Sequence, residues 1–286
     1  SDTFSVGEAG NVSVHARNIE IDKDGSSLFT GISSQAAPGS QGDAGTVSVT
    51  GTERLELDNG AGISSSTFGL GNAGGVSVSA GELKVDGKSV ANQFTGISSQ
   101  AAPGSQGDAG AVTVTVDGPM TLVNGGIISS DTFSPGNAGN ISVHAGECKI
   151  DGNGLTNLFT GISSQAAAGS KGDAGTVEVD VAGLLELFNG AEISSSTWSE
   201  GNAGFISVSS GELKMDNRGI TNQLTGIASQ AYTYSQGDAG TVAVQVDHLL
   251  SLFDGAAISS STWSQGNAGD VTIDAPTLLI DGQYSN

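Results

Sequence analysis

The chain has little of several residue types, and each shortage excludes a class of structure or function. One cysteine among 286 residues rules out an internal disulfide. Only 9 basic side chains accompany 30 acidic ones, and the net charge of −21 makes nucleic acid and anionic membrane surfaces poor partners. No apolar run approaches membrane-spanning length and no signal peptide is visible, so we expect no membrane insertion. No stretch of helical spacing is long enough to compete with the strand patterns.

Glycine is abundant instead, with 45 residues, and it recurs at a fixed interval. Three glycine motifs each start every 65 residues, and no insertion separates the copies, as expected when every unit must stack in register on its neighbours. We therefore predict a single continuous domain over residues 1–286, built from 65-residue double-coil repeats. The motifs are Gly-Ile-Ser-Ser-Gln or Gly-Ile-Ala-Ser-Gln from Gly31, Gly96, Gly161 and Gly226, Gly-Asp-Ala-Gly from Gly42, Gly107, Gly172 and Gly237, and Gly-Asn-Ala-Gly from Gly71, Gly136, Gly201 and Gly266.

Each repeat divides into two similar halves. The isoleucine that opens the Ser-Ser segment recurs from Ile32 to Ile258 with gaps that alternate between 31 and 34 residues. A half contains an alternating strand such as 46–49, a second such as 54–57, an Asp/Asn-Gly turn and the Ile-Ser-Ser strand. Such a triplet cannot bury its apolar face alone, but stacked coils allow every strand to pair in parallel with its equivalents. The sequence predicts an all-β fold, a right-handed parallel β-helix (β-solenoid) of about nine three-stranded coils.

Alternation within the strands predicts the core. The inward residues should be valines such as Val47 and Val49 in the first strand, leucines such as Leu55 and Leu57 in the second, and the isoleucine series in the third. Cys148 replaces one of the second-strand leucines and is expected to be a small core residue.

Polar side chains should form columns on the outside. In the second strand the charges favour cross-strand pairs between Glu56 and Lys84, and between Lys149, Glu186 and Lys214. The motif acids alternate with amides up one column, which keeps like charges from adjacent coils apart. This column contains Asp43, Asn72, Asp108, Asn137, Asp173, Asn202, Asp238 and Asn267.

Acidic residues also raise the question of catalysis, because polysaccharide-cleaving enzymes are common on parallel β-helices. An active site would be a local departure from the repeat, whereas these acids recur in every unit, so we expect no catalytic residues and no cofactor. The Gly-Gly-x-Gly-x-Asp calcium signature is absent. His15 and His144 lie in coils too far apart to share a metal ion, and His248 is solitary, so we also expect no metal site.

An aromatic column leaves two readings open. Phe68, Phe133, Trp198 and Trp263 alternate along the stack with Ala37, Ala102, Ala167 and Tyr232. We favour inward packing, in which large and small side chains interleave; an outward column would be an aromatic strip suited to sugar rings or to another protein. The segment Tyr232-Thr-Tyr234 replaces the Ala-Pro-Gly or Ala-Ala-Gly of earlier repeats. Candidate surface-binding residues are therefore Tyr232, Tyr234, Trp198 and Trp263, although drift in an exposed loop also explains the tyrosines.

A second column carries hydroxyl groups. The Ser-Ser pairs could form a flat face of the kind that ice-binding solenoids use, but glutamine and alanine interrupt it in alternate coils.

Segments such as Gly71-Asn-Ala-Gly-Gly-Val-Ser-Val, Leu185-Glu-Leu-Phe-Asn-Gly-Ala-Glu-Ile-Ser-Ser-Ser-Thr and Gly266-Asn-Ala-Gly-Asp-Val-Thr-Ile resemble the repeats of filamentous-haemagglutinin-like exoproteins of two-partner secretion. The resemblance implies a right-handed parallel β-helix, exported through a dedicated outer-membrane transporter, that forms the stalk of a surface adhesin, a biofilm protein or a contact-dependent toxin. That family's amino-terminal secretion domain does not appear here. Ser1 and Asn286 both fall within a repeat, which suggests a segment of a longer protein or a protomer with open ends.

These observations favour an extracellular structural and adhesive rod at a bacterial cell surface, presenting binding surfaces to an unknown glycan or protein target. One alternative is a self-assembling filament protomer, with end-to-end association through uncapped coils. The alternative from another class is a polysaccharide-active β-helix enzyme, which would release glycan cleavage products.

Overall fold

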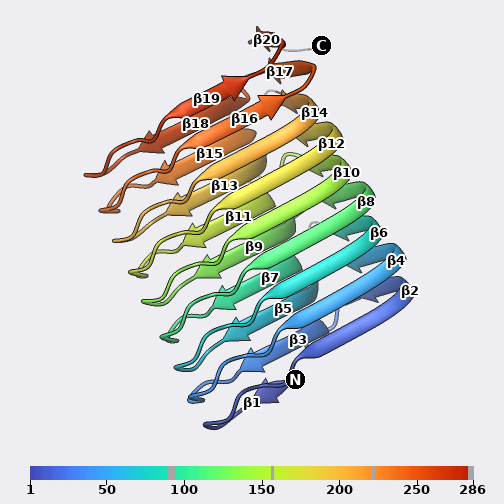
Figure 1. The fold of residues 1–286 in the computed structure, drawn as a ribbon, viewed down its shortest axis with the longest axis vertical. Coiled ribbons are helices and arrows are strands. Elements are labelled where there is room, and N and C mark those ends of the chain that lie inside the picture. The colour runs from blue at the N-terminus through green and yellow to red at the C-terminus, as the bar shows by residue number, and fades with distance from the viewer. Residues whose placement is uncertain (89–93, 156–157, 219, 221–222, 283–286) are drawn as a thin grey trace.

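The computed structural model describes residues 1–88, 94–155, 158–218, 220 and 223–282. The terminal Asn286 of the repeat argument lies outside these residues. The described chain is all-β, and its parallel strands stack in about nine coils of a β-solenoid (Figure 1). No α-helix with the length and hydrophobicity of a membrane span occurs in the described part of the chain.

One strand of each coil is short, and together these strands form the short-strand sheet. Its nine members pair in parallel, each with the equivalent strand of the next coil. They are β1 (Asp2–Thr3), β3 (Thr30–Ala36), β5 (Ala61–Thr67), β7 (Thr95–Ala101), β9 (Gly126–Thr132), β11 (Thr160–Ala166), β13 (Ala191–Thr197), β15 (Gly226–Ala231) and β18 (Ala257–Thr262).

The remaining strands form the long-strand sheet, which has 11 strands. Its members are β2 (Val12–Asp22), β4 (Val47–Asp58), β6 (Val76–Asp86), β8 (Val112–Val123), β10 (Ile141–Asp151), β12 (Val177–Phe188), β14 (Ile206–Asp216), β16 (Val242–Val246), β17 (Leu249–Phe253), β19 (Val271–Asp274) and β20 (Thr277–Asp281).

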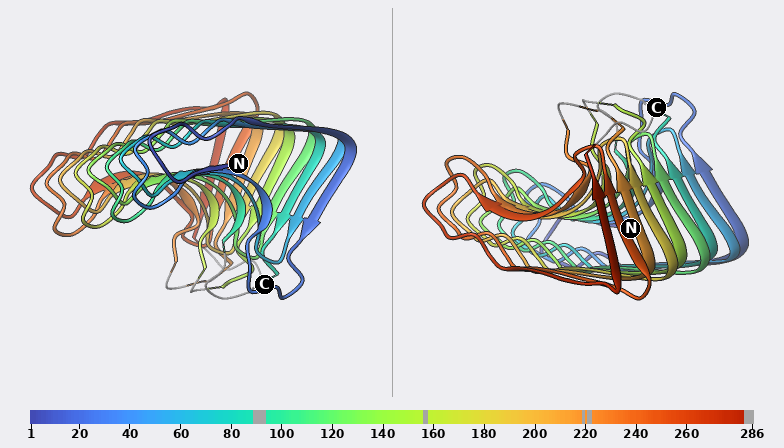
Figure 2. Two further views of the ribbon diagram at one scale, coloured as in Figure 1. Left: turned by 90° about the horizontal axis from the view of Figure 1, so that it is seen from below. Right: turned by 90° about the horizontal axis from the view of Figure 1, so that it is seen from above.

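The expected separation of the first two strands of a coil is wrong for most coils. Residues 47–49 of the first segment and the whole of the second, 54–57, belong to one strand, β4, whose pairing with β6 shifts register between Gly51 and Arg54. Such an irregularity bends a strand without ending it. Only the last coils divide the strand, as β16 and β17 and as β19 and β20. Viewed along the stack, the coil has an L-shaped cross-section, and the short-strand sheet lies on its concave side (Figure 2).

The predicted core is confirmed. Val47, Val49, Leu55, Leu57 and their equivalents in the following coils are buried in one apolar cluster, together with the central isoleucines of the short strands. Cys148 is part of this cluster, and burial raises the pKa of its thiol to about 12, so it is a core residue with no reactive thiolate at neutral pH.

A buried serine column, absent from the sequence predictions, joins the short-strand sheet to the Ala-Gly steps. Ser195 shows the pattern: its Oγ donates to the backbone oxygen of Gly175 at 2.9 Å and accepts from the backbone N–H of Gly204 at 2.7 Å. Each serine therefore connects backbone groups of two successive coils. The same two bonds recur at Ser34, Ser65, Ser99, Ser130, Ser164 and Ser229.

The alternating acid and amide column is confirmed, and its side chains bond to backbone. The N–H of Asn72 donates to Oδ1 of Asp43 at 2.6 Å, and the N–H of Asp108 donates to Oδ1 of Asn72 at 2.9 Å. The same pattern continues to Asn267, so each acid or amide holds the next coil in register.

The predicted charge pairs are confirmed in one case and wrong in the other. Lys84 Nζ lies 2.8 Å from Glu56 Oε1, and this contact is the main cause of a raised Lys84 pKa. Lys149 is opposite Glu186 in register, but its Nζ contacts Asp151 at 3.5 Å. Lys149 and Lys214 both lie over the ring of Phe188, at 5.8 and 5.4 Å, so this ring, and not Glu186, is the neighbour that the two lysines share.

Candidate binding groove

The outer face of the short-strand sheet lies on the concave side of the L (Figure 2), and the cavity described below, lined by residues of this face and by two phenylalanines, marks a groove whose floor is the sheet. Because strand side chains alternate, the residues between the buried isoleucine, serine and threonine of β5 face this groove. In β5 they are Gly62, Ser64 and Ser66, and in β7 they are Gly96, Ser98 and Gln100. The groove floor is therefore polar and repeats with the coils.

Glycine occupies one edge of the floor in five of the eight coils from β3 to β18, and there it has a steric reason; Ile127, Glu192 and Ala257 take this position in the other three. Gly96 has φ of 154°, and a β-carbon there would lie 1.8 Å from the backbone oxygen of Ile127 in the next coil. The space above this column is used by aromatic rings from the turns that precede β3 and β11. A β-carbon on Gly31 would lie 2.7 Å from Cζ of Phe29, and one on Gly161 would lie 3.1 Å from Cζ of Phe159. These phenyl rings form one wall of the groove.

In its amino-terminal half the groove contains a cavity of about 210 Å³. Two aromatic side chains, Phe29 and Phe94, line it on one side, and the sheet floor supplies hydroxyl, amide and carboxyl groups. The floor residues are Gln35, Ser64, Ser66, Ser98, Gln100, Ser129 and Asp131. An aromatic wall over a polar floor is typical of sites that bind ligands with both apolar faces and hydroxyl groups.

Two carboxyl groups in the floor have perturbed pKa values. Burial raises the pKa of Asp131 to about 7, although hydrogen bonds from Ser129 and from the backbone of Gln165 oppose the shift. Burial likewise raises the pKa of Glu192 to about 7. No lysine or arginine occupies the outward positions of the short strands, so the groove has acidic and neutral groups only.

Several polar atoms in the floor have no protein partner. They are Oδ1 of Asp131, Oγ of Ser194 and Oε1 of Gln230. Ser194 and Gln230 are almost fully covered, so these atoms are enclosed within the protein and are not open to the groove. A buried polar atom without a hydrogen bond costs free energy, so these atoms lower the stability of the floor.

The aromatic column lies along the other edge of the floor, so the favoured inward packing is wrong. Phe68 follows the buried Ile63 by five positions, and an odd offset in a strand places a side chain on the opposite face. The side chains of Trp198 and Trp263 are 43% and 54% exposed. Tyr232 stacks between them, with ring centroids 3.7 Å from Trp198 and 5.5 Å from Trp263. Burial within the stack, with a smaller effect of the Glu192 charge, raises the Tyr232 pKa.

Tyr234 differs from its equivalents in both exposure and backbone. Its side chain is 91% exposed, and its φ is 75°. The corresponding residues of the earlier repeats are Gly39, Gly104 and Gly169, with φ between 83° and 87°. A tyrosine in this left-handed conformation is strained, and strained exposed residues often belong to functional surfaces. The structure thus brings Trp198, Tyr232 and Trp263 together in one stack and leaves Tyr234 projecting beside it.

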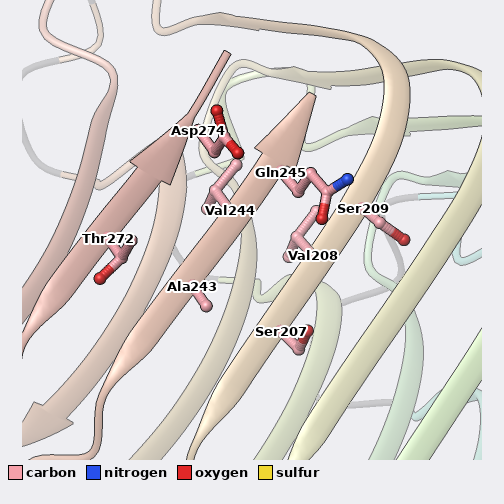
Figure 3. A pocket seen from close by; sticks show the side chains of 8 residues that line it. All are labelled: Ser207, Val208, Ser209, Ala243, Val244, Gln245, Thr272 and Asp274. Atoms are coloured by element: carbon pink, nitrogen blue, oxygen red, sulfur yellow. The ribbon is translucent and has the colours of Figure 1, made fainter. Parts of the chain in front are cut away.

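The other candidates carry less chemistry. His15 and His248 are exposed, and His144 Nδ1 is 3.4 Å from Asp180 Oδ2 at the surface. In the described residues no three histidine, cysteine, aspartate or glutamate side chains converge as they would around a metal ion. A depression of about 280 Å³ on the long-strand sheet, bordered by Ser209, Gln245 and Asp274, crosses β14, β16 and β19 (Figure 3).

The Ser-Ser hydroxyl face is wrong, because the two serines of each pair point to opposite sides of the sheet. Ser194 faces the groove, whereas Ser195 is part of the buried serine column. No single flat surface of hydroxyl groups results.

Comparisons with protein families, curated sequences and solved structures found no match. The likeness to filamentous-haemagglutinin repeats therefore depends on the repeat motifs alone. The stacked parallel coils are compatible with a repeat stalk of that kind.

The sequence indicates which residues face the groove but not that a groove exists. The aromatic residues and the Ser/Gln positions each lie an odd number of residues from the buried isoleucine of a short strand, so strand alternation places them on the outer face. The concavity itself has no such signal, because it depends on where the long strands bend. Phe29, Phe94, Asp131 and Glu192 were missed for that reason.

Proposed function

We propose that the protein is a structural and adhesive rod that works outside the cell, at a bacterial surface, and presents the groove and its aromatic edge to a surface glycan or protein. The observation that carries this proposal is the repetition of the same exposed groups on successive double coils. Added coils supply further copies of the binding surface rather than one unique site. Export through an outer-membrane two-partner-secretion transporter is part of the proposal.

The positions of the two perturbed carboxyl groups support binding over catalysis. Asp131 is in register with Gln165 of β11 and Ser196 of β13, whereas Glu192 precedes Ser196 by four residues. Two strand spacings and four residues separate them by about 16 Å on a flat sheet. Glycosidase carboxyl pairs lie roughly 5 to 9.5 Å apart. Asp131 and Glu192 are therefore too distant to form such a pair.

The test has two arms. Purified protein is applied to arrays of surface polysaccharides and surface proteins, and the same glycans are assayed for new reducing ends. We expect retention on at least one array and no release of reducing ends. Turnover that disappears in an Asp131→Asn or Glu192→Gln variant would instead support the polysaccharide-active enzyme.

A third measurement tests location. Antibody labelling of intact producing cells should match the labelling of permeabilised cells, as expected for a surface protein. Labelling that requires permeabilisation would contradict an extracellular role.

A further inference from the structure

We infer that the groove binds an extended, uncharged polysaccharide lengthwise, with one disaccharide for each double coil. This inference rests on the proposed binding function and assigns its ligand class.

The repeat length of the groove is the first argument. Its floor repeats every two coils, because glutamine in one coil alternates with serine or aspartate in the next, as in Gln100, Asp131 and Gln165. The phenyl wall also recurs every second coil, at Phe29, Phe94 and Phe159. Two coils span about 9.6 Å at the usual strand spacing. A linear polysaccharide whose successive rings are flipped repeats every two sugars, so it can make equivalent contacts on successive double coils of the cavity, which spans β3 to β9.

The chemistry of the groove is the second argument. Phenyl walls match the apolar C–H faces of pyranose rings, and hydroxyl and amide groups in the floor match sugar hydroxyls. In the cavity, Gln35, Gln100 and Asp131 supply amide and carboxyl groups that can form hydrogen bonds with sugar hydroxyls. A peptide strand fits less well, because the backbone groups of the floor already pair between coils.

Charge decides between classes of polysaccharide. The floor contains Asp131 and Glu192 and no cationic side chain, within a chain of net charge −21. A uronic acid polymer or a sulfated glycan would place like charges together in a poorly solvated groove. The groove therefore selects against anionic polymers.

The experiment measures binding by titration calorimetry with the intact chain. The probes are neutral β-linked gluco-oligosaccharides of increasing length, polygalacturonate and an unrelated extended peptide. We expect affinity to rise with oligosaccharide length and to level off when the ligand fills the groove, with no measurable binding of polygalacturonate.

The matched variants are Phe94→Ala in the groove wall and Phe205→Ala before β14, outside the groove. Their side chains are 39% and 41% exposed, so both substitutions remove a similar exposed ring. We expect Phe94→Ala to weaken oligosaccharide binding by about tenfold or more, as for an aromatic contact residue, and Phe205→Ala to leave it unchanged. Circular dichroism and thermal melting establish that both variants fold.

The outcomes separate the two proposals. Binding of polygalacturonate or of the peptide, or equal effects of the two phenylalanine variants, would overturn the ligand assignment and leave a binding rod intact. Failure of every array to retain the protein would overturn the proposed function as well.

Discussion

Replacing Ser195 by alanine is the sharpest test of the buried serine column. The substitution removes one hydroxyl group from a fully buried position and leaves the apolar core in place. Two backbone groups lose their partner, the oxygen of Gly175 and the N–H of Gly204. An unsatisfied buried polar group costs about 1 to 3 kcal/mol, so the loss of two partners should lower the free energy of unfolding by about 2 to 6 kcal/mol.

Ser194 provides a control on the same strand. Its Oγ has no hydrogen-bond partner, and it faces the groove instead of the Ala-Gly steps. The change Ser194→Ala should alter the free energy of unfolding by about 0.5 kcal/mol or less.

Urea unfolding of both variants, followed by circular dichroism, measures the difference. Stacked coils need not unfold in one step, so amide hydrogen exchange at Gly204 gives a local measurement. We expect faster exchange of that amide in Ser195→Ala and no change in Ser194→Ala. Equal stability of the two variants, with Gly204 still protected, would refute the role assigned to the column.

Three further predictions concern charge and backbone strain. Lys84→Met removes one of two cations from each of two nearly buried carboxylates, because Arg54 still contacts Glu56 and Lys88 still contacts Asp58, and should lower stability by about 1 kcal/mol in urea titrations. Lys214→Met, which loses a ring contact, should cost under about 1 kcal/mol. The folded state keeps the Asp131 proton up to about pH 7, whereas the unfolded state releases it near pH 4, so the free energy of unfolding should fall as the pH rises from 4 to 7. Asp131→Asn should therefore raise the melting temperature relative to wild type at pH 8 but not at pH 3. Tyr234→Gly should stabilise the fold by about 1 kcal/mol and Gly169→Tyr should destabilise it by at least as much, whereas opposite signs would argue against strain at this position.

The sequence determined the stack. Identical motifs every 65 residues require equivalent side chains to lie above one another, so Val47, Leu55 and Ile63 could be assigned to the core from alternation alone. The column from Asp43 to Asn267 and the Glu56–Lys84 pair follow from the same register. These features depend on the two-residue period of the strands and on the repeat length, and both can be read directly from the sequence.

Only the tertiary structure decided the shape of the coil and the contacts of the side chains on its outer face. The bend within β4, near Gly51, is set by local backbone geometry that the period-two pattern does not encode. The L-shaped path puts the short-strand sheet on the concave side of the coil, where Phe94 and Asp131 line one cavity. Likewise, Ser194 and Ser195 are the same residue type in sequence, and their environments differ because one faces the groove and the other faces the Gly204 step. Repetition fixes which residues are equivalent, whereas the path of the coil through space fixes what each of them contacts.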